Sequence, residues 1–353
     1  DLAVRDSSGF AMVAKNGVVA VVPNVLDHQC PIDIQVGENG EISGDIVALE
    51  FLSQDVGVAL TEVRNITDST NLSRSYYLLW TLDGGSTWTP SDLDEVLLDA
   101  DGGGWKLKRP SAMDWIGDTH AWIVELWGDR IFHTADGGQS WVIQHQAPEG
   151  LQAIHMHDSI TGWAVGAWGT MLHTGDGVNW VEQDAGAPAE LCDVTFLDAQ
   201  NGWVVGEAHT VLRTTDGGFT WEAFALNASV VNCDGCMTDS LVLGDVHFVT
   251  PMKGWILAPT LYYSTVDGGV SWTKHSNVSL YAGGPDIGDH TDLVFVDALQ
   301  GYMAGKNGIA MTTDGGASWV TQQTGIAVDD VTLVPGTSEV WATGGNGVMF
   351  KRD

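Results

Sequence analysis

The sequence predicts an all-β fold in which short antiparallel sheets repeat around a ring. A phrase of the form Asp-Gly-Gly-x-Ser/Thr-Trp recurs along the 353 residues, as in TTDGGFTW, TLDGGSTW and TADGGQSW. The chain also contains 44 Gly and 16 Trp, a composition typical of tight turns and large buried rings. No long stretch shows helical periodicity. Four strands repeated at a spacing of about 40–50 residues are typical of a β-propeller.

The repeat accounts for nearly the whole chain, which we expect to form one domain, residues 1–353. The copy at 45–88 carries the insertion RNITDSTNLSRS, and the end segments 1–24 and 329–353 lack the Asp motif. Seven blades result if these two ends share one blade, an arrangement that leaves no open sheet edge. A literal count predicts eight blades, with units that begin near residues 1, 45, 111, 151, 191, 245, 291 and 329.

Each unit is predicted to contain four antiparallel strands in chain order. In the unit at 191–221, DVTF alternates with period two, GWVVG follows after a short turn, and TVLRTT follows after a second turn. The second turn is KNG at 15–17 and 306–308 and GNG at 345–347, where Asn-Gly favours a tight hairpin. The Asp motif then leads into a fourth, outer strand that begins at its Trp.

The Asp motif is interpreted as a structural turn. In DGGFTW we expect the Asp216 carboxylate to accept hydrogen bonds from backbone N–H groups of its own turn, while the glycines supply positive φ. We expect Thr220 to bond locally and Trp221 to pack between units. The copies are Asp83–Trp88, Asp136–Trp141, Asp176–Trp180 in the shortened form DGVNW, Asp216–Trp221, Asp267–Trp272 and Asp314–Trp319.

These motifs resemble the Asp-box, or BNR-repeat, β-propellers. Within that group, NGWVVGEAHTVLRTTDGGFTW is most similar to the photosystem II stability/assembly factor family, and the resemblance covers nearly the whole chain. It implies seven blades and a non-catalytic scaffold in the thylakoid lumen or periplasmic space. It also implies a partner polypeptide held by a patch of arginines. The arginines of this chain are Arg5, Arg64, Arg74, Arg109, Arg130, Arg213 and Arg352.

The acidic composition excludes one class of partner. The formal net charge is −32, from 14 Lys and Arg against 46 Asp and Glu, whereas binding to nucleic acid needs clustered cations. No apolar run is long enough to span a bilayer as a helix. In LDADGGGW, Asp99 and Asp101 resemble the opening of a calcium loop, but the later acidic ligand is missing. We predict no cofactor, with a divalent cation such as calcium as the alternative.

Cysteines and sequons favour an exported glycoprotein. An even number of cysteines fits two disulfides, although CDGC could instead be a redox pair or half of a zinc site. The disulfide candidates are Cys30, Cys192, Cys233 and Cys236. The glycosylation candidates are Asn65, Asn71, Asn227 and Asn277. The thylakoid lumen, the periplasm and the extracellular space are the compartments that agree with these features.

Two residue sets carry hypotheses about binding. Aligned on Phe196, the first strands bring one residue of each unit to the ring axis, where His and carboxylate groups could hold a metal ion. The alternative, which we favour, is that each contacts a neighbouring blade; the weak metal candidates are Glu50, Asp114, His155 and His247.

At the turn after the second strand, large rings replace Asn-Gly in three consecutive units, and we expect a patch that contacts a protein or a glycan. The alternative is that the rings fold over a neighbouring loop; they are Trp127, Trp168 and His209.

Function is predicted first as a non-catalytic protein-binding scaffold that resembles a photosystem II assembly or stability factor. The second hypothesis is an exported structural or adhesive glycoprotein that self-assembles into a surface layer or filament. A glycoside hydrolase is third, since paired carboxylates are available. Sialidases need three arginines around a substrate carboxylate and an Arg-Ile-Pro start motif, which is missing here. Asp-box xyloglucan hydrolases use a cleft between two propellers, and this chain has room for one, so no catalytic residue is assigned.

Overall fold

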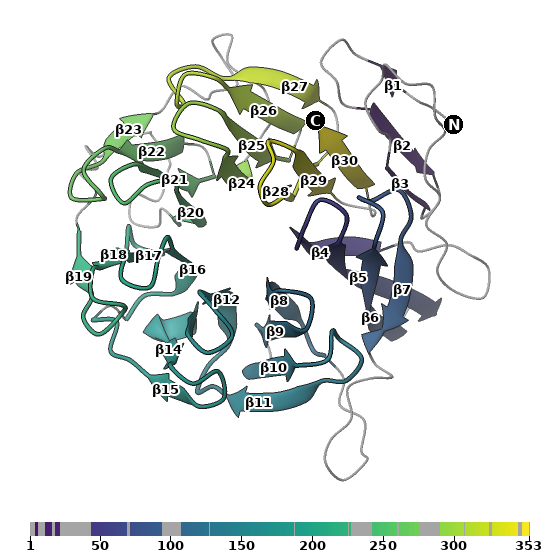
Figure 1. Cartoon of the computed structure of the whole chain (residues 1–353), viewed down its shortest axis with the longest axis horizontal. Helices are drawn as coiled ribbons and strands as arrows, with labels where there is room; N and C mark the ends of the chain where they lie inside the picture. Colours follow the sequence, from purple (N-terminus) through teal and green to yellow (C-terminus); the bar gives the residue numbers. More distant parts are fainter. Residues whose placement is uncertain are drawn as a thin grey trace.

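The computed structural model contains seven β-sheets arranged around a common axis (Figure 1). The innermost strand of each sheet contacts the innermost strand of the next, and β28 contacts β4, which closes the ring. The structure describes residues 4–5, 11–15, 18–21, 44–68, 71–93, 107–126, 128–186, 188–224, 226, 242–259, 261–275, 290–306, 308–324, 327–344 and 348–352.

Six of the seven sheets have four antiparallel strands, and the seventh has three. The first two blades are β4 (Gly44–Phe51), β5 (Gly57–Asp68), β6 (Asn71–Thr81), β7 (Thr89–Asp92) and β8 (Pro110–Ile116), β9 (His120–Glu125), β10 (Arg130–Thr134), β11 (Val142–Gln146). The next two are β12 (Leu151–Met156), β13 (Gly162–Gly166), β14 (Met171–Thr174), β15 (Trp180–Glu182) and β16 (Leu191–Phe196), β17 (Gly202–Gly206), β18 (Val211–Thr214), β19 (Glu222–Ala223). The last three are β20 (Asp245–Phe248), β21 (Gly254–Ala258), β22 (Leu261–Thr265), β23 (Thr273–His275), then β24 (His290–Phe295), β25 (Gly301–Gly305), β26 (Gly308–Thr312), β27 (Val320–Thr324), and β28 (Asp330–Leu333), β29 (Val340–Gly344), β30 (Val348–Arg352).

The literal count of eight blades is one too high. The N-terminal strands β1 (Val4–Arg5), β2 (Ala11–Lys15) and β3 (Val18–Val21) form a separate three-stranded sheet. That sheet lies at the outer edge of the ring, where β2 and β3 contact β30 (Figure 1). The segment copies the first three strands of the repeat, but it does not contribute an innermost strand to the axis. The N-terminal sheet therefore lies beside the last strand of the seventh blade.

Aromatic stacking joins several of the blades to the next. Trp203 on β17 is fully buried and stacks on Phe248 of β20, with ring centroids 3.5 Å apart and planes at 10°. Trp272, the Trp of the next Asp motif, meets Phe248 edge-on at 5.9 Å. The same arrangement recurs at Trp163–Phe196 and Trp255–Phe295, with centroid distances of 3.5 and 3.4 Å. Such stacked and edge-on pairs add to the hydrophobic burial of large rings.

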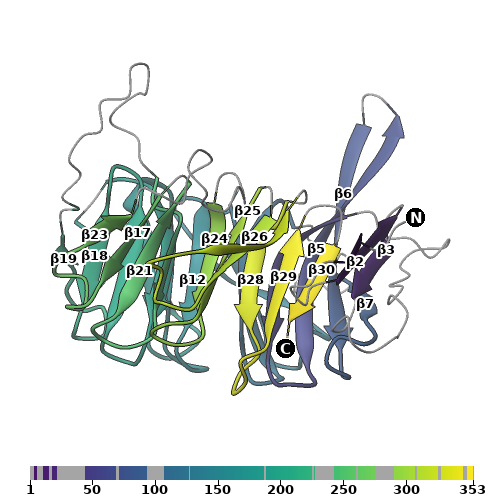
Figure 2. The ribbon, with the colours of Figure 1, turned by 90° about the horizontal axis from the view of Figure 1, so that it is seen from above.

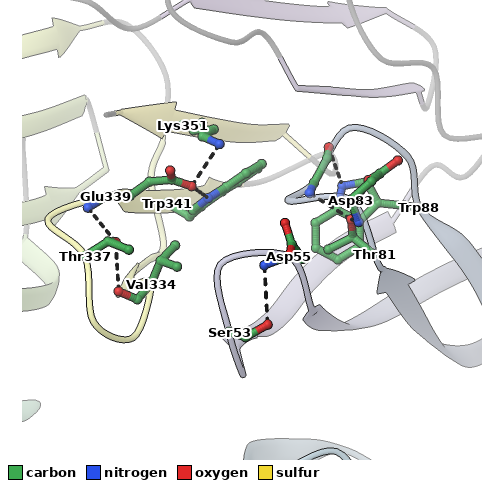
Figure 3. Close-up of polar contacts among 11 residues, drawn as sticks. Ser53, Asp55, Thr81, Asp83, Trp88, Val334, Thr337, Glu339, Trp341 and Lys351 are labelled. Atoms are coloured by element: carbon green, nitrogen blue, oxygen red, sulfur yellow. Dashed lines mark hydrogen bonds and ion pairs between the residues drawn. The ribbon is translucent and has the colours of Figure 1, made fainter.

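The closing junction between the last and first blades uses the same contact. Trp341 on β29 stacks on Phe51 of β4, with centroids 4.9 Å apart, and Trp88 meets both rings edge-on. The Trp341 Nε1–H donates to Glu339, which also pairs with Lys351 at 2.9 Å (Figure 3). A Cβ at Gly85 would overlap the Trp341 ring, so only glycine fits there. The ring therefore closes through side-chain packing rather than through a shared sheet.

The ring has two distinct faces. Turns between second and third strands lie on one face, and the Asp-motif turns between third and fourth strands lie on the other. The β5–β6 hairpin is longer than its counterparts, because the insertion of the first unit continues both strands, and it projects from the first of these faces (Figure 2). Within the described residues, no helix has the length and apolar character needed to cross a membrane.

Candidate functional site

The Asp motif forms a turn whose polar groups hydrogen-bond to one another. The Asp216 Oδ1 atom accepts the backbone N–H of Thr220 at 2.9 Å, and Oδ2 accepts the Thr220 hydroxyl at 2.6 Å. The Thr214 hydroxyl donates to Oδ1 at 2.8 Å and accepts the Gly218 N–H at 2.9 Å. These hydrogen bonds, led by the one from the Thr220 hydroxyl, lower the pKa of Asp216. The carboxylate thus stays ionised and engaged, which suits a structural group and not a general acid.

The other five motifs have the same geometry. A Thr hydroxyl two residues before the Asp donates to it in each turn, at 2.8 to 3.3 Å. The shortened turn at Asp176 replaces the Ser or Thr with Asn179, whose backbone N–H and side-chain amide lower the pKa of Asp176 to about 2. The sequence analysis assigned roles to the Asp, Gly, Ser or Thr and Trp positions but missed this buried Thr. Its recurrence was the available signal: Thr81, Thr134, Thr174, Thr214, Thr265 and Thr312.

The four axial candidates contact neighbouring blades instead of converging. The Glu50 Oε2 atom accepts the N–H of Trp115 at 3.1 Å, and the Asp114 Oδ2 atom accepts the N–H of Met156 at 2.5 Å. His247 Nε2 hydrogen-bonds with the carbonyl of Phe295 at 3.1 Å, while His155 stacks on Phe196 at 6.0 Å. The described residues contain no group of three or more His, Cys, Asp or Glu that could hold a metal ion.

Burial controls the protonation of these axial groups. Burial raises the pKa of Asp114 to about 7, and burial followed by the charge of Asp114 raises the pKa of Glu50. Burial lowers the pKa of His155 to about 4 and also lowers the pKa of His247. The arrangement therefore favours neutral side chains that link the inner strands.

Trp168 is the most exposed candidate of the predicted aromatic patch. Its side chain is 77% exposed, and its backbone adopts φ 55, a left-handed conformation that few non-glycine residues take. The turn that carries it, η1 (Ala167–Gly169), is held by the Ala167 N–H to Gly150 carbonyl bond at 2.9 Å and the Gly166 N–H to Thr170 carbonyl bond at 2.9 Å. The hydrogen-bonded turn therefore exposes the Trp168 indole ring to solvent.

The rest of the predicted patch differs from expectation. The turn at 206–210 has the same backbone hydrogen bonds as the turn at 166–170. Ala208 is therefore equivalent to Trp168, and His209 is equivalent to Gly169. Both Ala208 and His209 have positive φ, of 53 and 61, and His209 is only partly exposed. Trp127 lies outside the described residues. Trp168 is therefore the residue that best represents the patch.

Arginines of the described residues contact carboxylates or a neighbouring turn. Arg130 is buried and pairs with Glu125 at 2.7 Å, and Arg74 pairs with Glu62 at 3.4 Å. These two lie on adjacent blades that are linked by the Tyr76 hydroxyl, which donates to the Lys108 carbonyl, and by the Lys108 N–H, which donates to Glu125. Arg213 lies two blades further on, partly buried beside the turn of the next Asp motif.

The cysteine and sequon predictions are only partly covered by the structure. Cys192 is a free thiol, and burial raises its pKa to about 12. Its three potential partners lie outside the described residues, so the disulfides stay a prediction. Asn65 and Asn71 lie on β5 and β6, in the projecting hairpin. The candidates outside the described residues are Cys30, Cys233, Cys236, Asn227, Asn277, Asp99 and Asp101.

Comparison with known proteins agrees with the repeat analysis. The model of the family described as photosynthesis system II assembly factor YCF48 matches residues 176–234. A structure of YCF48 bound to D1 peptide is 19% identical, with a TM-score of 0.60, and the match covers 90% of this chain and 95% of that one. YCF48 from Cyanidioschyzon merolae is 17% identical, with a TM-score of 0.60 and coverages of 88% and 96%. No curated protein sequence matches the chain.

A glycosidase propeller has the same fold at greater sequence distance. The GH74 xyloglucanase from Xanthomonas campestris is 12% identical, with a TM-score of 0.62, and the match covers 95% of this chain but only 56% of that one. Identities this low establish the shared fold and nothing about chemistry. The chain is a BNR-type β-propeller whose repeat is similar to that of the photosystem II assembly factors.

Proposed function

We propose that this β-propeller is a non-catalytic scaffold that binds a partner polypeptide through the face that carries Trp168. The observation that carries the proposal is the exposed indole on a rigid turn. Large aromatic side chains are enriched among the residues that dominate protein–protein binding. A turn already fixed by hydrogen bonds loses little conformational entropy when a partner binds.

The surroundings of Trp168 favour a partner segment with basic residues. The turn η1 contacts β16, and the segments next to β16 contain Glu190 and Glu207, whose backbones are joined by an N–H to carbonyl bond of 2.9 Å. A Lys or Arg side chain of the partner can interact with the indole ring and with the negative charge of these segments. The net charge of −32 would also attract a basic partner over a long range.

The likeness to YCF48 suggests the setting of this role. YCF48 has been solved with a D1 peptide, so a ring of similar fold binds a peptide. We propose an exported compartment, the thylakoid lumen, the periplasm or the extracellular space, and a role in assembling a membrane-protein complex. The Asp-motif carboxylates are committed to their own turns, which supports a non-enzymatic role.

Binding of a labelled D1 peptide tests the proposal. Fluorescence anisotropy should show saturable binding that weakens at least about tenfold in Trp168→Ala, which corresponds to about 1.4 kcal/mol. Phe219→Ala is the matched control, because Phe219 is 81% exposed but belongs to an Asp-motif turn on the opposite face. Equal losses in the two variants, or no saturable binding to the wild-type protein, would count against the proposed face or partner.

A structural glycoprotein is the second candidate, supported by the projecting hairpin. That hairpin carries the sequons of Asn65 and Asn71 away from the body of the ring (Figure 2). Mass spectrometry of glycopeptides from natively purified protein distinguishes the two roles. Glycans at these positions with self-association as the main interaction would favour the second candidate.

A further inference from the structure

Partly buried carboxylates form a chain of contacts between the inner strands of the last four blades. Asp193, Asp245, Asp292 and Asp330 occupy equivalent positions on β16, β20, β24 and β28, which follow one another around the axis (Figure 1). Three of them accept the backbone N–H of the strand in the next blade. The pairs are Val246 to Asp193 at 2.9 Å, Val331 to Asp292 at 2.7 Å and Leu49 to Asp330 at 3.1 Å.

Asp245 breaks this pattern. Its equivalent donor would be the N–H of Leu293, but that group donates to Asp292 Oδ1 at 2.8 Å. The Asp245 Oδ2 atom is shielded from solvent and has no hydrogen-bond partner among the described residues. The carboxyl groups of Asp193 and Asp292 flank it, close enough for a hydrogen bond if one group of a pair carries a proton. An ionised Asp245 would therefore face two carboxylates with no donor between them.

No Lys or Arg side chain is available on these strands to neutralise the cluster. The seven innermost strands, all within the described part of the chain, contain no Lys or Arg, and neither do β17, β21 and β25 behind them. The nearest titratable groups on the packed elements are Cys192 and Asp193 on β16, His247 on β20, Asp292 on β24, Asp329 and Asp330 at β28, Asp45 and Glu50 on β4, and Asp114 on β8.

We propose that protons on Asp193 and Asp245, donated to the carboxylates that face them, hold the ring together at its axis, so that the blades are coupled in acidic solution and become less tightly coupled when Asp193 and Asp245 ionise. A carboxyl that carries a proton can donate to a neighbouring carboxylate, which turns a repulsive pair into a hydrogen bond. Loss of the proton leaves like charges facing one another across the junctions of β20 with β16 and β24.

The direction of the pH effect follows from the protonation of the folded state. Burial, then the charges of Asp292 and Asp193, raises the pKa of Asp245, and burial also raises the pKa values of Asp193 and Asp330. Because these carboxyl groups bind more protons in the folded protein than in the unfolded chain, their contribution to stability is greatest below the unfolded Asp pKa of about 4 and falls as pH rises towards the folded values. Each such proton contributes at most about a tenfold rise in the unfolding constant per pH unit.

Urea unfolding between about pH 5 and pH 9 tests the proposal. The measurement is made with chelator in about 1 M NaCl, where a Debye length of about 3 Å screens surface repulsion. Above about pH 7, where the buried His155 and His247 are neutral in both the folded and the unfolded state, we expect the unfolding constant of the wild-type protein to rise with pH, and Asp245→Asn to reduce that rise by up to about tenfold per pH unit. Asp118→Asn, in the exposed turn between β8 and β9, should leave the rise of the unfolding constant with pH unchanged.

Infrared spectroscopy provides a second readout that does not depend on whether the variant folds. The wild-type protein should show the C=O stretch of protonated carboxyl groups at neutral pH, with a weaker band in Asp245→Asn and an unchanged band in Asp118→Asn. A wild-type spectrum without this band would overturn the proposal. The same pH slope in wild type and Asp245→Asn would also overturn it.

Discussion

The Thr two residues before each Asp is the residue on which the turn depends most. Thr214 is 1% exposed, and its hydroxyl both donates to Asp216 and accepts from Gly218. Thr220 also bonds to Asp216, but it is exposed, so water can replace it. The two hydroxyls therefore contribute differently, although both belong to one turn.

Replacement of Thr214 by Val tests this difference. Val keeps the shape but removes the hydroxyl, so the buried Gly218 N–H loses its acceptor, and we expect a loss of about 1–3 kcal/mol in the free energy of unfolding. Thr220→Val should cost less, about 0.5–1.5 kcal/mol. Urea denaturation of both variants measures the difference. Equal losses would show that the buried hydroxyl has no special role.

The sequence predicted the residues of the site only in part. Recurrence identified the Asp motifs, and the alignment on Phe196 brought Glu50 and Asp114 to equivalent positions. The alignment did not identify Asp193 and Asp245, because each lies two residues before the aligned position, on the same face of its strand. Whether such groups meet a backbone N–H or another carboxylate depends on the register between blades, which no repeat pattern contains.

At the scale of elements, the second glycine of the Asp motif determines how closely two blades can pack. Gly218 has φ 82, and a Cβ there would overlap the Trp163 indole of the preceding blade. Gly336 has a similar φ of 76, but a Cβ there would meet nothing within 4 Å. A comparison of Gly218 with Gly336 therefore distinguishes the cost of backbone strain from the cost of a clash between blades.

Alanine substitutions at the two glycines should therefore have unequal effects. Gly336→Ala should cost about 1–2 kcal/mol, the strain of a left-handed alanine. Gly218→Ala adds about 1–3 kcal/mol because the Trp163 ring must shift. Thermal or urea unfolding measures both, and a fluorescence change of the buried indole should accompany only Gly218→Ala. Identical costs would contradict the role assigned to the contact between blades.

Strand order was predictable from sequence, whereas strand length was not. Period-two alternation and Asn-Gly turns predicted four strands per unit, and the sheets show that order. The insertion in the first unit gave no signal of continued pairing, yet β5 and β6 pair through Ile66 and Leu72. Polar residues in an insertion fit either a loop or an exposed hairpin.

At the scale of the whole molecule, the number of blades depends on where the N-terminal segment packs. Its sequence matches three strands of the repeat, but ring closure is achieved by contact of β28 with β4. A repeat count cannot distinguish an inner blade from a copy at the outer edge, because both have the same strand pattern. The family resemblance, which implied seven blades, agreed with the ring where the literal count did not.

The central claim, that a partner binds the Trp168 face, is tested most directly by amide hydrogen exchange with and without the D1 peptide. We expect slower exchange in the turns at 166–170 and 206–210 of the peptide-bound protein. Exchange in the Asp-motif turns, such as 216–221, should stay the same. Protection of the Asp-motif turns instead, or no protection of either face at saturating peptide, would contradict binding at the Trp168 face.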